Sequence, residues 1–242
     1  MKESAAAAST GQMRRGVNWW WLAVPTVLLL GTAVYGILRY PSLPELIATH
    51  WDAHGEANGF SAKSVGAAFT GVFAFAGFLL VMAGVSVLVA KAPLKNPAGV
   101  DEHMNLRQGI ASSNASLTFL GILTNAMSVV MAAAALMVFS TSGVSVPVYV
   151  PMILVFGGLA VGGWVAWRQY RRELATAGQP SSDADGHWIA GMIYNNPDDE
   201  RVLVPKLVGI GLTVNWARTG GKFFYLGILA LVLLAPLVAL LA

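Results

Sequence analysis

Two histidines and two carboxylates alternate in one short polar run of the sequence, residues 50–56. His50 and His54 are four residues apart, and Asp52 and Glu56 lie beside them. A spacing of four places two side chains on the same face of an α-helix. Imidazole and carboxylate groups bind zinc and other divalent metals, so the set predicts a metal site. Local hydrogen bonding at a membrane surface and pH sensing are the alternatives, since histidine titrates near neutrality.

Three consecutive carboxylates form a second candidate cluster near the C-terminal end of the sequence. Asp198, Asp199 and Glu200 follow Asn195-Asn196-Pro197, a combination typical of a turn. The carboxylates could bind a cation or pair with Arg201, with Lys206 or with the cluster Arg168, Arg171 and Arg172. Alternatively, the turn is solvated and its Asp side chains accept hydrogen bonds from nearby backbone amides.

A polar face recurs within an otherwise apolar stretch of residues 112–139. Its members follow at steps of four and three, which is one side of a helix: Asn114, Thr118, Gly121, Asn125 and Ser128. An amide buried in lipid needs a partner, so this face must meet other helices or water. It either packs against small residues such as Gly158, Gly162, Gly77 and Gly84, or lines a ligand cavity contacted by Asn114 and Asn125.

Composition identifies the kind of protein that must position these residues. Of 242 residues, 56% are apolar and 11% are charged, whereas soluble domains carry about 25% charge. This balance excludes a disordered chain or a coiled coil and indicates an integral membrane protein. The sequence has no cysteine, which excludes a disulfide scaffold and thiolate metal centres. Gly-x-Ser-x-Gly, phosphate-loop and His-Glu-x-x-His motifs are absent, so we expect a non-enzymatic protein without a cofactor, except for a divalent metal such as zinc.

Five apolar stretches are long enough to cross a bilayer as helices. Each contains about 20 or more residues without an ionisable side chain, which matches the hydrocarbon thickness: residues 18–38, 65–90, 112–139, 147–167 and 223–242. The sequence therefore predicts an all-α integral membrane protein. The predicted architecture is a five-helix transmembrane bundle with an ordered extracytoplasmic loop and a small cytoplasmic β-hairpin.

The distribution of basic residues predicts the orientation. With a cytoplasmic N-terminus, every Lys and Arg except Arg39 and Lys63 falls on the inner side. This positive-inside bias predicts an inner N-terminus, an outer C-terminus and inner contacts with anionic lipid headgroups. The sequence pI near 9.3 is explained by topology, so we expect no nucleic-acid partner.

The spans divide the chain into five segments: a cytoplasmic tail at 1–17, spans one and two with their outer loop 39–64 at 18–90, spans three and four at 91–167, an inner loop at 168–222, and span five at 223–242.

In the outer loop, Leu43, Leu46, Ile47 and Trp51 recur at helical spacing and predict a short interfacial helix that ends at Gly55. In the inner loop, residues 187–194 and 201–206 predict a β-hairpin whose tip is at 197–199.

The outer loop resembles the SdpI family of bacterial multi-span membrane proteins. The resemblance rests on one set of residues: Leu43-Pro44, Ile47, His50-Trp51-Asp52, Gly55, Asn58, Phe60, Ser61 and Lys63. His54 is not part of that pattern. The C-terminal half resembles a module of unassigned chemistry that often accompanies such loops, through Tyr194–Arg201, Val204-Pro205-Lys206, Gly209, Gly211, Thr213 and Asn215. The resemblance implies the bacterial cytoplasmic membrane, toxin immunity, and signalling by retention of a repressor at the membrane.

Three functional hypotheses follow. In the first, the protein binds an extracellular peptide or toxin through the outer loop and a cytoplasmic protein through the inner loop. The expected ligand contacts are His50, Trp51, Asp52, Asn58 and Lys63. The expected partner contacts are Tyr194, Asn195, Asn196, Pro197, Asp198, Asp199, Arg201, Lys206 and Asn215. The second is a metal-binding protein or metal-dependent membrane enzyme using His50, His54, Asp52 and Glu56, and the third is an accessory subunit of a larger membrane complex or transporter.

Overall fold

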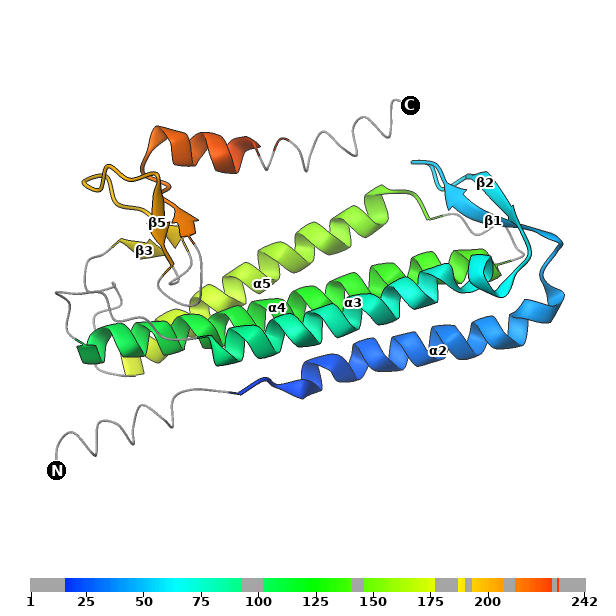
Figure 1. Ribbon diagram of the computed structural model, residues 1–242, viewed down its shortest axis with the longest axis horizontal. Helices are drawn as coiled ribbons and strands as arrows, with labels where there is room; N and C mark the ends of the chain where they lie inside the picture. Colours follow the sequence, from blue (N-terminus) through cyan, green and yellow to red (C-terminus); the bar gives the residue numbers. More distant parts are fainter. Residues whose placement is uncertain are drawn as a thin grey trace. The chain divides into compact units, whose positions relative to one another are not determined.

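The computed structural model describes residues 16–92, 102–140, 146–176, 187–189, 193–206, 212–227 and 230 (Figure 1). This part of the chain is mostly helical and carries small antiparallel sheets. The helices are η1 (Trp19–Leu22), α2 (Ala23–Arg39), η2 (Tyr40–Ser42), α3 (Val65–Lys91), α4 (Glu102–Phe139) and α5 (Tyr149–Thr176). The strands are β1 (Leu46–Trp51), β2 (Ala57–Ala62), β3 (Trp188–Ile189), β4 (Ile193–Tyr194), β5 (Leu203–Pro205) and β6 (Leu212–Val214).

Four helical stretches of the described residues are long and apolar enough to cross a membrane. They are Trp19–Ser42, Val65–Lys91, Arg107–Phe139 and Tyr149–Ala175. The chain is therefore a multi-pass membrane protein, and these stretches coincide with the first four predicted spans. Of the predicted fifth span, residues 223–227 and 230 are helical, and the remainder lies outside the described residues.

Helices α4 and α5 extend beyond the apolar stretches 112–139 and 147–167 that the sequence predicted as spans. α4 begins at Glu102 and α5 ends at Thr176, so each has a polar end next to its predicted apolar stretch. Hydropathy detects only the apolar part, whereas Arg, Gln and Glu also have good helix propensity. The polar extension of α5 carries side chains that contact polar residues within the apolar stretch of α4, as described below.

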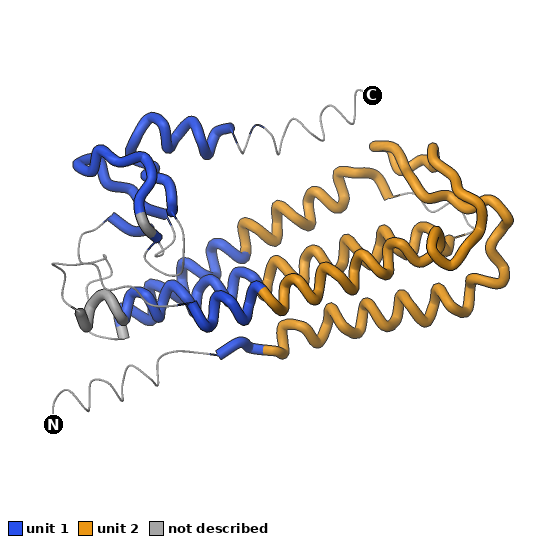
Figure 2. Tube along the Cα trace, in the orientation of Figure 1, with its two compact units in different colours: residues 1–18, 85–120, 162–231 blue, residues 19–84, 121–161, 232–242 orange. Residues whose placement is uncertain are grey.

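The chain divides into two compact units, shown in different colours in Figure 2. Unit 1 contains residues 1–18, 85–120 and 162–231, and unit 2 contains residues 19–84, 121–161 and 232–242. The core of unit 2 joins Leu43 and Ile47 to Phe69 of α3 and Phe139 of α4. The core of unit 1 is formed by α4 and α5, where Ala111, Ala115, Ala166, Tyr170 and Leu174 are buried.

The predicted interfacial helix in the 39–64 loop is wrong: the segment forms the antiparallel β1–β2 hairpin. Leu46 pairs with Ala62 and Trp51 pairs with Ala57. The β-branched Ile47 favours a strand, and Gly55 takes a left-handed φ of 84° that closes a tight turn. His50 and His54 consequently do not share a helical face.

The predicted hairpin between residues 187–194 and 201–206 is also wrong in its pairing. Within the first run, β3 pairs with β4, so that Trp188 lies opposite Tyr194. The second run, β5, pairs with β6, and Leu203 lies opposite Val214. Asn215, the residue after β6, is buried and hydrogen-bonded to the backbone of the Asn-Pro-Asp-Asp turn, which joins β6 to this turn.

Candidate functional site

The β1–β2 hairpin is closed by a turn that Asp52 organises. The Asp52 carboxylate oxygen Oδ1 accepts hydrogen bonds from the amides of His54 and Glu56, each at 2.9 Å. Donation from the Glu56 amide and then from the His54 amide lowers the pKa of Asp52, and the charge of His54 acts in the same direction. The turn therefore presents an ionised carboxylate at neutral pH.

Apolar burial and backbone contacts hold the hairpin on unit 2. Ile47 is 2% exposed and Leu43 is 5% exposed, both in the core formed with α3 and α4. Lys63 donates from Nζ to the carbonyls of Pro41 at 3.2 Å and Leu43 at 2.9 Å, which fixes the base of the hairpin. At the turn, the amide of Val148 donates to the carbonyl of Ala53 at 3.1 Å and joins it to the segment before α5.

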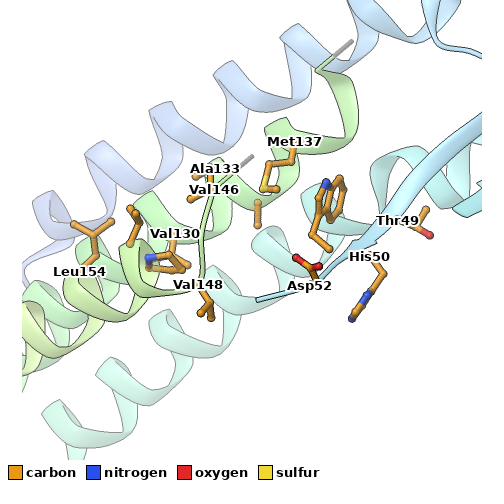
Figure 3. A pocket seen from close by; sticks show the side chains of 13 residues that line it. Thr49, His50, Asp52, Val130, Ala133, Met137, Val146, Val148 and Leu154 are labelled. Carbon is orange, nitrogen blue, oxygen red and sulfur yellow. The ribbon is translucent and has the colours of Figure 1, made fainter. Parts of the chain in front are cut away.

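A cavity of about 320 Å³ lies beneath this hairpin, within unit 2. Its polar and aromatic edge comes from β1 and the following residue: Thr49, His50, Trp51 and Asp52. The rest is apolar and comes from α4, α5 and the residues preceding α5, among them Val130, Ala133, Met137, Val148 and Leu154. Figure 3 shows the Asp52 carboxylate turned toward these apolar side chains, whereas the His50 ring points away from them.

The sequence-predicted ligand contacts of this loop separate into two groups. Trp51 and Asp52 lie at the cavity beside His50, whose Nδ1 is hydrogen-bonded to the Asn58 side chain at 2.5 Å. Lys63 lies at the base of the hairpin, where the Pro41 and Leu43 carbonyls bind its ammonium group. Asn58 is exposed and reaches the cavity only through His50.

The proposed metal ligands do not come together. His54 and Glu56 are exposed, and each donates its backbone amide to the Asp52 carboxylate. Among the described residues, no group of three His, Asp or Glu side chains has a geometry that could hold a metal ion. The hairpin removes the helical spacing on which the metal hypothesis rested.

The predicted polar face of α4 meets different partners along its length. In unit 1, Asn114 donates to the Glu173 carboxylate at 2.8 Å and Thr118 donates to the Gln169 side chain at 2.6 Å. Both partners lie in the polar extension of α5. Close packing replaces a water-filled path here, because Asn114 is 2% exposed.

The remainder of this polar face lies in unit 2 and contacts η1. Asn125 donates to the carbonyl of Trp21 at 2.9 Å. A Cβ on Gly121 would come within 2.6 Å of the Trp21 ring, so only glycine allows this approach. Among the predicted glycine contacts, Gly158 faces Ala126 of α4, whereas a Cβ on Gly77 or Gly84 would meet nothing within 4 Å.

Within the described residues of the C-terminal segment, 193–206 and 212–227, one buried amide joins groups that are far apart in the sequence. Asn215 is 0% exposed, and its Nδ2 donates to the carbonyls of Asn196 at 2.8 Å and Asp199 at 3.0 Å. Its Oδ1 accepts from the amides of Asn196 at 3.0 Å and Ala217 at 3.2 Å. We call Asn215 and its hydrogen-bond partners Asn196, Asp199 and Ala217 the Asn215 knot. Asn215 is thus a structural centre rather than an exposed contact.

Charged and phenolic groups surround the knot. Arg201 donates two hydrogen bonds to the Asp199 carboxylate, from Nε at 2.9 Å and from Nη2 at 2.7 Å. This fork holds the pKa of Asp199 well below its usual value. Burial raises the pKa of Tyr194, whose hydroxyl donates to Asp199 at 3.1 Å.

Sequence reasoning missed the α4 and α5 residues of the cavity and the polar partners in α5. The alanines and valines of the cavity carry no signal, since their side chains are those of any membrane helix. Gln169 and Glu173 do carry one: they are spaced by four, so they share a helix face that could have been matched to Asn114 and Thr118.

Two parts of the chain match known sequence families. Residues 27–75 match a domain of unknown function (DUF1648), which is an SdpI-associated domain in many bacterial membrane proteins. Residues 197–222 match a family of unknown function (DUF5808). The first match covers the β1–β2 hairpin with parts of α2 and α3, and the second covers most of the Asn215 knot. No curated protein and no solved structure matches the chain.

Proposed function

We propose that this protein is a non-enzymatic receptor of the bacterial cytoplasmic membrane that binds a hydrophobic extracytoplasmic peptide and confers immunity or signals. The observation that carries the proposal is the cavity of about 320 Å³ beneath the β1–β2 hairpin. Ligand sites are concave and mostly apolar, with a few polar groups that set orientation. This cavity has that composition.

The chemistry of the cavity favours a particular kind of peptide. Its apolar wall suits a large aliphatic or aromatic side chain, and burying such a side chain contributes roughly 1.5–3 kcal/mol. The ionised Asp52 at the edge suits a cationic or amide group next to that side chain. A peptide that is both hydrophobic and cationic has these groups, as many membrane-active toxins do.

The proposed orientation places the hairpin outside the cell and the Asn215 knot inside. It rests on the bias of the basic residues, all of which except Arg39 and Lys63 would then lie on the inner side. Because the chain has no cysteine, single cysteines can report it without background. His54→Cys and Glu200→Cys suit the purpose, since both residues are exposed. An impermeant thiol reagent added to intact cells should label the first and not the second; the reverse pattern would refute the orientation.

Peptide binding is tested by filling the cavity. Ala133→Phe places a ring in the apolar wall, whereas Leu136→Phe adds a ring at an exposed position of the same helix that does not line the cavity. A sensitive bacterial host expressing each variant is challenged with secreted cationic hydrophobic peptides. The wild type and Leu136→Phe should protect the host, and Ala133→Phe should not, at equal amounts in the membrane.

Two outcomes would refute the receptor proposal. One is protection by Ala133→Phe equal to that by the wild type. The other is failure of the correctly inserted wild type to protect against any peptide of the panel.

The proposed cytoplasmic partner would meet the exposed rim of the Asn215 knot. Pro197, Asp198, Arg201 and Lys206 are exposed, whereas Asn215 is inaccessible. Substituting Asp198→Ala and Lys206→Ala together should release a co-purifying partner from membrane extracts without unfolding the knot. Partner retention by this double variant would locate any such contact elsewhere.

A further inference from the structure

A hollow of about 430 Å³ lies against α5 in unit 1, where the predicted apolar stretch 147–167 is followed by charged residues. It is lined by Trp164, Val165, Arg168, Gln169, Arg172 and Glu173. Trp164, Arg168 and Arg172 follow at steps of four, so they share one helix face. The hollow therefore combines an aromatic ring with two guanidinium groups at the boundary between apolar and charged sequence.

Arg168 is arranged as an anion-binding group. The Arg168 guanidinium carbon lies 5.3 Å from the centre of the Trp164 ring, within the range of a cation–π contact. Stacking on an indole covers the face of a guanidinium and leaves its N–H edge directed outward. That edge matches the oxygens of a phosphate in a bidentate geometry.

The acidic member of the hollow has polar partners within the protein. The Glu173 carboxylate accepts hydrogen bonds from Asn114 of α4 and from Gln169, each at 2.8 Å. With one carboxylate against two guanidinium groups, the lining keeps a net positive charge. Charge complementarity therefore favours an anionic ligand.

The position on the helix favours a lipid over a soluble anion. Trp164 is 54% exposed, and the apolar Val165 lines the hollow beside it, so aromatic and apolar surface adjoins the two arginines within the same unit. Tryptophan and arginine together are typical of a helix at the headgroup level of a membrane. A ligand with a phosphate headgroup and acyl chains would contact both surfaces at once.

We infer that Trp164, Arg168 and Arg172 form a binding site for the phosphate headgroup of an anionic phospholipid. The inference does not depend on the proposed peptide receptor, which uses a cavity in the other unit. The site would bind one phospholipid specifically, which differs from the general attraction of basic residues to an anionic leaflet.

The test compares phospholipid binding to two double variants with the same loss of charge. Arg168→Gln/Arg172→Gln removes the charges of the hollow. Arg171→Gln/Lys222→Gln removes two exposed charges that do not line it; Arg171 stacks on Trp167 instead. Full-length protein in neutral detergent is titrated with phosphatidylglycerol or phosphatidylcholine. Bound lipid is counted by native mass spectrometry, and helical circular dichroism verifies the fold.

We expect the wild type to retain phosphatidylglycerol over phosphatidylcholine. The hollow variant should bind phosphatidylglycerol about 25-fold more weakly, at about fivefold for each arginine. The matched variant should stay within about threefold of the wild type. Equal weakening of the two double variants would overturn the site, because it would show general charge attraction alone.

Two further measurements test the chemistry of the site. Arg168→Lys/Arg172→Lys keeps the charge but loses the planar fork, so its affinity should fall below that of the wild type; full affinity would refute recognition by the guanidinium fork. Inorganic phosphate, compared with chloride at equal ionic strength, should not displace the phospholipid. Displacement by phosphate would identify a soluble anion as the ligand and overturn the lipid assignment.

Discussion

The β1–β2 hairpin and the Asn215 knot each depend on one short polar side chain, but the two side chains work over different distances along the chain. Asp52 is hydrogen-bonded to amides two and four residues away, at the end of a ladder of paired strands. Asn215 is hydrogen-bonded to groups up to 19 residues away, and it is fully buried. The strands beside it have only two or three residues each.

The difference shows two ways to order a polar segment beside membrane helices. The hairpin has backbone pairing and an apolar anchor in Ile47, so its turn side chain adds only local order. The knot has little backbone pairing, and a buried amide supplies the contacts that longer strands would otherwise make. We therefore expect substitutions in the knot to cost more stability than substitutions in the hairpin turn.

The largest effect is expected for Asn215→Ala. The substitution leaves buried amides and carbonyls without partners, each at a cost of about 1–3 kcal/mol, so the knot should lose about 4 kcal/mol or its fold. Hydrogen exchange of residues 193–227 in solubilised protein measures the loss. Asn195→Ala is the control. The backbone amide of Asn195 donates to the His187 carbonyl, and this substitution keeps that amide. Similar exchange in the two variants would refute the central role of Asn215.

Gly221→Ala should follow, at about 2–3 kcal/mol. Gly221 lies in the helical residues 219–227. A Cβ on Gly221 would lie far inside contact distance of the Asn215 carbonyl oxygen, so either this helical segment or the knot must move. Gly227→Ala is the matched control, since a Cβ there meets nothing within 4 Å. The same exchange measurement applies, and unaltered protection in Gly221→Ala would show that the helix start adjusts freely.

Acidification should weaken the knot more than it weakens the hairpin turn. The folded-state pKa of Asp199 is below its unfolded value near 3.9, so this group stabilises the knot above about pH 4. That contribution is lost as pH falls from about 4 toward the folded-state pKa. Asp52 has the same sign, but its pKa is lowered chiefly by the backbone amides of Glu56 and His54, with the charge of His54 acting in the same direction. Hydrogen exchange in each region during thermal unfolding, repeated from pH 7 to pH 3, measures the stability of the knot and of the hairpin turn. Asp199→Asn should reduce the dependence of the knot's stability on pH.

The smallest effect is expected for Gly55→Ala in the hairpin turn. Its φ of 84° costs a side-chain-bearing residue about 1–2 kcal/mol. Exchange should accelerate in residues 46–62 and remain unchanged in residues 193–227. A larger loss of protection than in Asn215→Ala would reverse the comparison between the two regions.

Much of the helical fold could be predicted, and less of the candidate site. Apolar length located four spans because hydropathy is a sum over neighbouring residues. The apolar spacing in residues 43–51 predicted a helix, but residues 46–51 pair with residues 57–62 as a strand, and the spacing carries no information on that partner. Trp51 and Asp52 could be proposed as contacts from the loop alone, but the apolar wall of the cavity could not, since Ala133 and Met137 differ in no way from other residues of a membrane helix.

By itself, the sequence determined that this protein is built of membrane helices and where its two polar regions interrupt them, because both properties depend on residues close together in the chain. Tertiary structure decided which distant groups meet: the Ala53 carbonyl with Val148, Asn125 with the Trp21 carbonyl, and Asn215 with Asn196. The physical reason is that a buried polar group must find a partner, but its own sequence neighbourhood does not specify which one.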